Sequence, residues 1–93
     1  MPYFYVYILK CCDGSYYTGH TDDIEKRLAE HKAKKFSGYT SERLPVKLVF
    51  MQHFGTRYEA LCAEQKLKKW TRKKKEALIY EGWEGIIKLR KKH

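Results

Sequence analysis

The chain begins with a hairpin signal in residues 3–20, which read YFYVYILKCCDGSYYTGH. Residues 3–12 are rich in tyrosine, valine, isoleucine and leucine, and Lys10 is their only charged residue. Such a run predicts a β-strand that is covered on both faces. Asp13-Gly14 then leads into a second run of β-favouring residues, and Asp-Gly between two such runs is the strongest short signal for a hairpin. The fold is therefore expected to start with two antiparallel strands.

The length of the hairpin loop decides which side chains share a face of the sheet. A two-residue loop would place Tyr7 and Tyr17 on opposite faces, because neighbouring strand residues alternate. A three-residue loop of residues 12–14, with Gly14 in the left-handed conformation, pairs Tyr7 with Gly19 and puts both tyrosines on one face. We favour the three-residue loop, partly because a shared site needs both tyrosines on the same side.

Later patterns predict one more strand and three helices. Asp22 is expected to cap a helix that starts near Ile24. A strand is expected from Val46 to about Phe54. Thr56 starts a capping-box pattern for a second helix that runs to about residue 70, and Thr71 caps a lysine-rich third helix that runs to residue 80.

The order strand, strand, helix, strand, helix, helix predicts the fold class. It is α+β, a three-stranded antiparallel sheet flanked by helices. A chain of 93 residues makes one small domain with a modest core. We expect a single domain over residues 1–93, with its core in about residues 3–79 and a basic tail in residues 80–93 that is helical at most near its end.

Two polar residues interrupt the apolar face of the first helix. Ile24, Arg27, Leu28 and His31 share one face because their spacing is i, i+3, i+4 and i+7. Most helical arginines are solvated, but Arg27 on this face needs an anion, and no nearby acid is an obvious partner. A phosphate fits its guanidinium fork. His31 is either a half-buried histidine with ordinary hydrogen bonds or a proton acceptor for the tyrosines.

A carboxylate interrupts the apolar face of the second helix. Glu64 lies between Leu61 and Leu67 on the face that Ala60 also occupies. Carboxylates at such positions are rarely buried unless they are paired or bind a metal. One interpretation is a salt bridge with one of the many lysines. The other is a magnesium ligand, because Mg²⁺ takes one or two carboxylates together with water and phosphate oxygens.

The charge of the chain indicates an anionic partner. Lysine and arginine number 20 against 11 acids, which gives a net charge of +9. Nucleic acid is the commonest partner of such a surface, although a solvated, merely solubilising surface is the alternative. The candidate phosphate contacts in the lysine-rich stretches are Lys32, Lys34, Lys35, Lys66, Lys68, Lys69, Arg72 and Lys73.

The cysteines and the hydropathy pattern limit other functions. Cys11 and Cys12 are adjacent and should point to opposite faces, so they make neither a good disulfide nor a metal clamp. With no Cys-x-x-Cys spacing and scattered histidines, we expect buried free thiols and no structural zinc. We also expect no signal peptide, no membrane span and a cytoplasmic location.

Taken together, these residues resemble the GIY-YIG nuclease domain, and specifically its small stand-alone, YhbQ-like members. The first motif falls on Tyr5-Val6-Tyr7 and the second on Tyr17-Thr18-Gly19. The family's arginine, histidine and metal-binding glutamate fall on Arg27, His31 and Glu64. Tyr5 stands where the first motif has glycine, Thr18 stands where the second has isoleucine, and the chain contains no asparagine to match one that many members carry near the C-terminus.

The resemblance implies a metal-dependent endonuclease that hydrolyses DNA phosphodiester bonds. In that function Tyr7 orients or deprotonates water, His31 takes the proton onward, and Tyr17 supports the network. Arg27 binds the scissile phosphate, and Glu64 holds one Mg²⁺ or Mn²⁺ ion that binds together with substrate. We expect these five residues to line one concave surface.

The expected substrate is branched or otherwise structured DNA, in a repair or recombination process. The expected state is a monomer, with a larger repair or nucleoprotein complex as a further expected partner. The alternative is a nucleic-acid-binding module that keeps this fold without the chemistry, because fold alone does not confer function. A third option is an accessory protein that docks onto a nucleoprotein complex.

Overall fold

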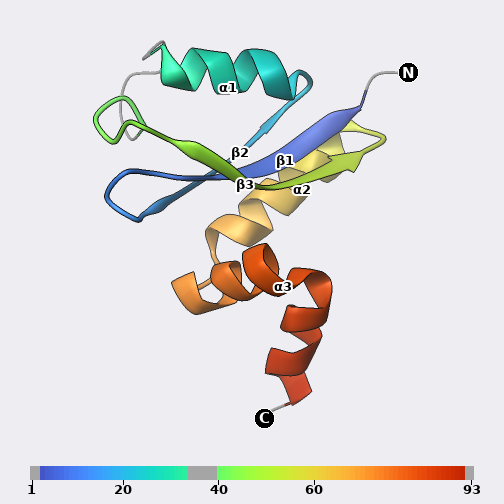
Figure 1. Ribbon diagram of the computed structural model, residues 1–93. Helices are drawn as coiled ribbons and strands as arrows, with labels where there is room; N and C mark the ends of the chain where they lie inside the picture. The colour runs from blue at the N-terminus through green and yellow to red at the C-terminus, as the bar shows by residue number, and fades with distance from the viewer. Residues whose placement is uncertain (1–2, 34–39, 92–93) are drawn as a thin grey trace.

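A computed structural model describes residues 3–33 and 40–91 of the chain, and Lys34 and Lys35 lie outside these residues. The elements are β1 (Phe4–Lys10), β2 (Tyr16–Thr21), α1 (Ile24–Lys32), β3 (Lys47–Phe54), α2 (Arg57–Lys68) and α3 (Arg72–Lys91). The strands form one antiparallel sheet in the order β2-β1-β3. This arrangement confirms the predicted α+β fold with helices on a three-stranded antiparallel sheet (Figure 1).

The hairpin between β1 and β2 has the three-residue loop. Tyr7 pairs with Gly19, and Leu9 pairs with Tyr17. The amide of Cys11 bonds to the carbonyl of Ser15 at 2.8 Å, which closes the loop. Gly14 has a φ of 85°, a conformation that glycine adopts without strain. The predicted register is therefore confirmed, and Tyr7 and Tyr17 lie on the same face.

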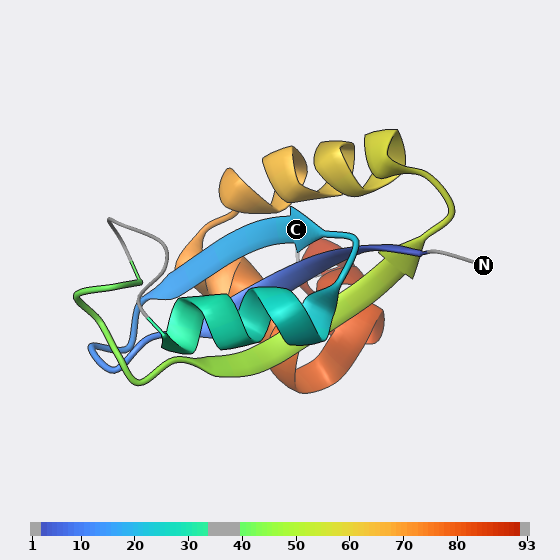
Figure 2. The ribbon, with the colours of Figure 1, turned by 90° about the horizontal axis from the view of Figure 1, so that it is seen from above.

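Helices cover both faces of the sheet. α1 lies on one face, and α2 and α3 lie on the other (Figures 1 and 2). Tyr7 and Leu9 pack toward α1, in a cluster that includes Ile24 and Leu28. Val6 and Ile8 pack toward α2 and α3. β1 is thus buried on both faces, as its continuous apolar run predicts.

Each helix begins at a side-chain cap, and the cap of α1 corrects a prediction. Asp23, not Asp22, caps α1, because its carboxylate accepts a hydrogen bond from the amide of Lys26 at 3.1 Å. Asp22 instead pairs with Arg57 at 3.2 Å. Thr56 caps α2, as predicted.

The segment from residue 80 onward is the second half of α3. The helix runs to Lys91 with a kink at Gly82, whose φ is 67°. Ile86 is 6% exposed and belongs to the core cluster with Leu78. Residues 80–91 therefore pack on the domain, where the sequence predicts a basic tail.

Among the described residues, no helix is long and apolar enough to span a membrane.

The three cysteines are free thiols in this structure. Cys11 is buried just after β1, whereas Cys12 lies in the hairpin turn and is exposed. Cys62 is exposed on α2. The expectation of buried thiols is therefore correct for Cys11 and wrong for the other two.

Candidate active site

A buried hydrogen-bonded chain runs from β1 through α1 to the segment before β3. The Tyr7 hydroxyl lies 3.0 Å from Nε2 of His31, and Nδ1 of His31 lies 2.8 Å from the hydroxyl of Thr40. All three residues are 1% exposed. A neutral His31 with its proton on Nδ1 accepts a hydrogen bond from Tyr7 and donates one to Thr40. The hydrogen bond to Thr40 thus orients the imidazole ring, and Nε2 accepts the hydrogen bond from the Tyr7 hydroxyl.

Burial keeps both members of the Tyr7–His31 pair neutral. Burial and the neighbouring Tyr17 raise the pKa of Tyr7 to about 12, against a smaller opposing effect of Arg27. Burial and the positive charge of Arg27 lower the pKa of His31 below its ordinary value. At neutral pH the pair is therefore a phenol next to a neutral imidazole.

The ring of Tyr17 completes an aromatic cluster with Tyr7 and His31. Its centroid lies 5.1 Å from the imidazole and 6.4 Å from the Tyr7 ring. Gly19 makes this close approach possible. A Cβ atom at Gly19 would lie 2.6 Å from the Tyr7 hydroxyl oxygen and 3.2 Å from a ring carbon of Tyr17. The glycine of the second motif thus provides the space that the two tyrosines occupy.

Arg27 lies at the edge of this cluster, and its contacts correct a prediction. Its Nη1 donates to the carbonyl of His20 at 3.4 Å, and its Nε lies 3.5 Å from the carboxylate of Glu30. The expectation that no acid on this face pairs with Arg27 is therefore wrong, because Glu30 lies one turn further along α1. The Arg27 side chain is 32% exposed, so a solvent-borne phosphate can reach it and compete with Glu30.

Glu64 on α2 is held from two sides. Its Oε1 lies 2.6 Å from Nδ1 of His20, and its Oε2 lies 2.9 Å from the ammonium of Lys68. Burial alone would raise the pKa of Glu64, but hydrogen bonds from His20 and Lys68 bring the pKa below its ordinary value. The salt-bridge interpretation is thus correct for this structure. Lys68 pairs with Glu64 and is also part of the exposed basic surface.

His20 connects the two sides of β2. Its carbonyl accepts from Arg27, whereas its ring contacts Glu64. Glu64 is also close enough to contribute to the raised pKa of Tyr7. His20 was not among the predicted site residues, although its position next to Gly19 places its ring on the face opposite Tyr7. Glu30 and Thr40 were also missed, because neither interrupts an apolar pattern.

The structure brings the predicted site residues together without exposing them all. Tyr7, Tyr17, Arg27 and His31 gather on the α1 side of the β1–β2 pair, and Glu64 lies across β2. The expectation that all five line a concave surface is wrong for Tyr7 and His31, because each is 1% exposed. These two lie beneath the surface that Arg27 and Tyr17 reach.

Among the predicted site residues, Glu64 is the one carboxylate that could anchor a metal ion. In the part of the chain that the structure describes, no group of three or more histidine, cysteine, aspartate or glutamate residues could hold a metal. Glu64 is ionised at neutral pH, and its partner Lys68 has a half-exposed side chain that can turn into solvent. One carboxylate completed by water and phosphate oxygens is typical of Mg²⁺.

The predicted phosphate contacts inside the described residues are surface groups. Lys32, Lys66, Lys68, Lys69, Arg72 and Lys73 are all exposed. The guanidinium of Arg72 also lies 5.0 Å above the ring of Tyr16 and pairs with Glu76, so it has a packing role.

The burial of His31 predicts how stability depends on pH. The folded pKa of His31 lies below its value of about 6.5 in an unfolded chain, so the unfolded state binds a proton first as the pH falls. The free energy of unfolding should therefore fall as the pH drops below about 6.5. The measurement is urea unfolding between pH 8 and pH 5.

A His31→Gln variant should lose part of this pH dependence, whatever its stability at pH 8. His53→Gln, on the exposed edge of β3, is the matched control and should keep the slope of the natural chain. An unchanged slope in His31→Gln would contradict the assignment of a buried, neutral imidazole.

Fold and site together define a class of protein. It comprises small α+β domains in which two tyrosines, an arginine and a histidine gather on a three-stranded antiparallel sheet, with a carboxylate on a later helix. The chain belongs to the GIY-YIG family, because its residues 3–77 match the family described as the GIY-YIG catalytic domain.

Several similar proteins carry the name UPF0213. A UPF0213 protein of Haloquadratum walsbyi is 49% identical over 80 residues, which cover 86% of this chain and 90% of that protein. The UPF0213 protein YazA of Bacillus subtilis is 47% identical over 77 residues, with coverages of 83% and 78%.

Two solved structures share the fold. The NMR structure of a UPF0213 protein from Bacillus halodurans has a TM-score of 0.54 and 43% identity, and the match covers 83% of this chain and 82% of that one. An NMR structure of a protein from E. faecalis has a TM-score of 0.57 and 44% identity, with coverages of 82% and 81%.

Proposed function

We propose that this domain is a metal-dependent endonuclease that hydrolyses DNA phosphodiester bonds. The observation that carries the proposal is the juxtaposition, at β2, of a neutral tyrosine–histidine pair, an arginine and an ionised carboxylate. Tyr7 and His31 are hydrogen-bonded, Arg27 lies next to them, and Glu64 lies across the strand. Membership of the GIY-YIG nuclease family supports the same reaction class.

Arg27 is the group that binds the scissile phosphate. Its guanidinium can make two parallel hydrogen bonds to phosphate oxygens, and its charge stabilises the negative charge that gathers on them in the transition state. Binding would replace the long contact to Glu30, which measures 3.5 Å. Arg27 therefore has a phosphate-binding role that its partly exposed position permits.

Tyr7 and His31 handle the proton of the attacking water. With a pKa near 12, Tyr7 is protonated at neutral pH, so it can take a proton from water only while it passes its own to His31 Nε2. The charge of Arg27 opposes this step because it lowers the pKa of His31. A bound phosphate neutralises that charge, so substrate binding itself makes His31 a better acceptor. Tyr17, which is partly exposed, supports the network.

Glu64 is the residue that would hold the metal ion. His20 and Lys68 keep its carboxylate ionised and oriented, and Lys68 would turn away when an ion binds. When bound, Mg²⁺ or Mn²⁺ supplies Lewis-acid stabilisation to the leaving oxygen of the phosphodiester.

The substrate is DNA chosen by its structure more than by its sequence. The exposed lysines of α2 and α3 provide phosphate contacts, which position a duplex without reading bases. Branched, flapped or nicked DNA, as in repair and recombination, is therefore the proposed substrate.

A cleavage assay tests the proposed function. The protein is incubated with linear, nicked, flapped and branched DNA, in Mg²⁺, in Mn²⁺ and in EDTA. We expect cleavage that requires the divalent ion and disappears in Glu64→Gln, while Glu84→Gln, which alters an exposed carboxylate of α3, remains active. Binding without cleavage of any substrate would instead favour a non-catalytic nucleic-acid-binding module, which the burial of Tyr7 and His31 would also suit.

Binding measured without metal should depend strongly on salt. Each phosphate contact should contribute about 0.9 to the slope of log K against log salt concentration. Lys69→Gln or Lys73→Gln should each lower that slope by about 1, and Lys47→Gln, on β3, is the control. Fluorescence anisotropy with one duplex at several salt concentrations measures this slope. A flat response would show that the positive charge serves solubility alone.

A further inference from the structure

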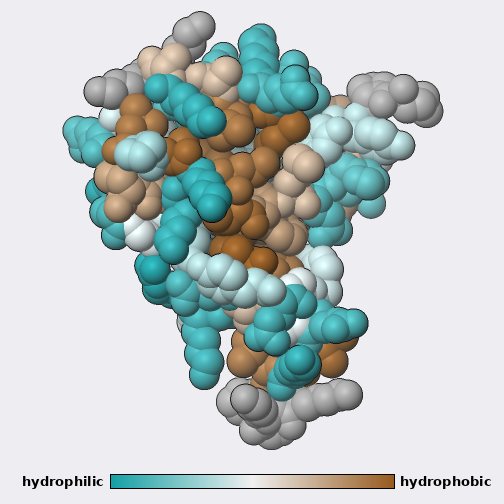
Figure 3. Space-filling model, viewed as in Figure 1, coloured by the Kyte–Doolittle hydropathy of each residue, from teal (hydrophilic) through white to brown (hydrophobic). Residues whose placement is uncertain are grey.

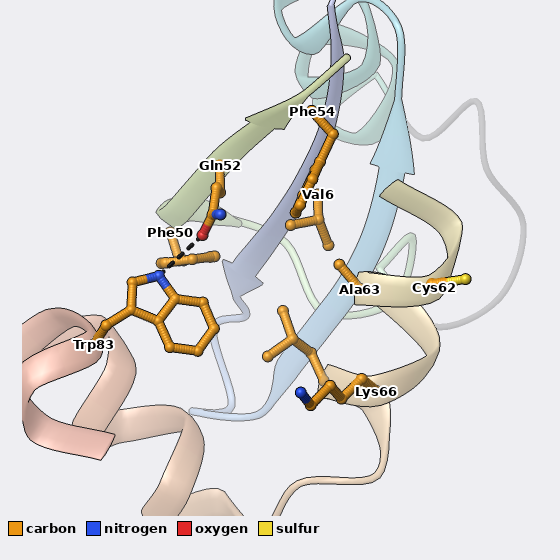
Figure 4. A pocket seen from close by; sticks show the side chains of 9 residues that line it. Val6, Phe50, Gln52, Phe54, Cys62, Ala63, Lys66 and Trp83 are labelled. Atoms are coloured by element: carbon orange, nitrogen blue, oxygen red, sulfur yellow. Dashed lines mark hydrogen bonds between the residues drawn. The ribbon is translucent and has the colours of Figure 1, made fainter. Parts of the chain in front are cut away.

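A cavity of about 310 Å³ lies on the sheet face opposite the Tyr7–His31 pair. β1 and β3 form its floor, and α2 and α3 form its sides (Figure 4). Phe50, Phe54 and Trp83 contribute aromatic rings to its walls. A largely apolar wall with a few polar groups is typical of ligand-binding cavities, and this volume is at the lower end of their range. The cavity therefore suits one small planar group.

Trp83 offers this cavity a flat apolar surface in a fixed orientation. Its indole Nε1 donates to Oε1 of Gln52 at 3.0 Å, and its ring stands edge-on to Trp70 at 6.0 Å. Trp83 nevertheless remains 48% exposed. In Figure 3, hydrophobic residues gather in the middle of the molecule, between hydrophilic ones. A tryptophan that is held in place and half exposed favours a partner ring that stacks on it.

The polar groups of the cavity indicate that its occupant is anionic and carries hydrogen-bond acceptors. Lys66 lines the wall with its ammonium directed toward the same space as Trp83 (Figure 4). Gln52 gives its oxygen to Trp83, and its amide NH₂ can donate to the edge of a planar ring. A nucleobase with its phosphate has this combination of planar ring, acceptor edge and negative charge.

We propose that the cavity binds one unpaired nucleobase of a DNA strand, stacked on Trp83, with a phosphate of that strand on Lys66. The proposal rests on the proposed function only in that the substrate is DNA. One helix connects the two sites, because α2 carries Glu64 on its β2 side and Lys66 on its cavity side. The cavity would give a single small domain a preference for DNA with unpaired nucleotides.

The test compares three duplexes in EDTA by fluorescence anisotropy. One carries a single extra adenosine, one carries an abasic residue at that position, and one is fully paired. Stacking of a base on an aromatic side chain predicts that the adenosine duplex binds on the order of tenfold more tightly than the abasic one. Equal affinities for these two duplexes would overturn the proposal.

Single substitutions test whether the preference for the unpaired base arises at the cavity. Trp83→Leu should bind the adenosine and abasic duplexes equally, whereas Tyr58→Leu, which replaces an aromatic residue that is 75% exposed outside the cavity, should keep the preference. Lys66→Gln should weaken binding of the adenosine duplex more than that of the paired duplex. A preference that persists in Trp83→Leu would contradict the proposal.

A second measurement needs no variant. In ¹⁵N NMR spectra of the natural chain, the adenosine duplex should shift the indole NH of Trp83 and the side-chain amide of Gln52, and the abasic duplex should not. Shifts confined to other residues would overturn the cavity as the site. Because no metal is present, these results do not depend on cleavage, and a protein without nuclease activity could still confirm the base-binding cavity.

Discussion

Arg27→Ala is expected to lower the rate of DNA cleavage on the order of 100- to 1000-fold. This is the usual effect of removing one preorganised donor from a developing anionic charge, about 3 kcal/mol of transition-state stabilisation. Arg27 is partly exposed, and two of its contacts within the protein are long, at 3.4 Å to the carbonyl of His20 and 3.5 Å to Glu30. Its loss should therefore leave the fold largely intact. Single-turnover cleavage with saturating metal measures the effect, and urea unfolding checks the fold.

Arg43→Ala is the matched control for this prediction. Its side chain is 33% exposed and pairs with Asp13 at 3.0 Å, at the hairpin-loop end of the sheet. The substitution removes the same charge from a side chain that pairs with the hairpin loop, and it leaves the backbone of residue 43 in place. Equal losses of cleavage in Arg27→Ala and Arg43→Ala would show that arginine charge, and not a specific phosphate contact, determines the rate.

Gly19→Ala is expected to abolish cleavage and to destabilise the protein by about 1–3 kcal/mol, the usual effect of overpacking a core. The new Cβ would lie 2.6 Å from the hydroxyl oxygen of Tyr7 and 2.8 Å from its Cζ. Tyr7 has no room to move away, because it is buried and bonded to His31. The tyrosine would have to leave its position against the imidazole. Cleavage assays and thermal unfolding measure the two effects.

Gly55→Ala is the matched glycine control. An added Cβ there would lie 4.0 Å from its nearest neighbour, a carboxylate oxygen of Glu59. This variant should keep both activity and stability. If Gly19→Ala were as active and as stable as Gly55→Ala, the close approach of Tyr7 to the second motif would not matter for the site.

Local signals in the sequence predicted the hairpin and the helical face on the α1 side of the site. Asp13-Gly14 indicates a hairpin but leaves its loop length open, and the three-residue loop was preferred partly because a shared site needs both tyrosines on one face; the structure confirms it, with Tyr7 opposite Gly19. Helical spacing then directs Arg27 and His31 toward the tyrosines. These relations hold over short distances along the chain, where turn chemistry and periodicity decide the geometry.

The α2 side of the site depends on tertiary packing and was only partly predictable. Helical periodicity indicates that Glu64 faces inward, but not that His20 and Lys68 meet it. His20 and Glu64 are 44 residues apart, and their contact follows from how α2 lies against β2. Likewise, the glycines after residue 80 suggest a loose tail, whereas the burial of Ile86 keeps that segment on the domain.

The central claim is that Arg27 and Glu64, on opposite sides of β2, belong to one site that hydrolyses DNA. A double-mutant cycle tests it most directly, with single-turnover cleavage rates of one flapped duplex in Mg²⁺ for the natural chain, Arg27→Ala, Glu64→Ala and the double variant. Residues that act as one unit lose activity non-additively. We predict that each single variant is nearly inactive and that the double variant is scarcely slower than the slower single variant. Cleavage that persists unchanged in both single variants would contradict the assignment of this site.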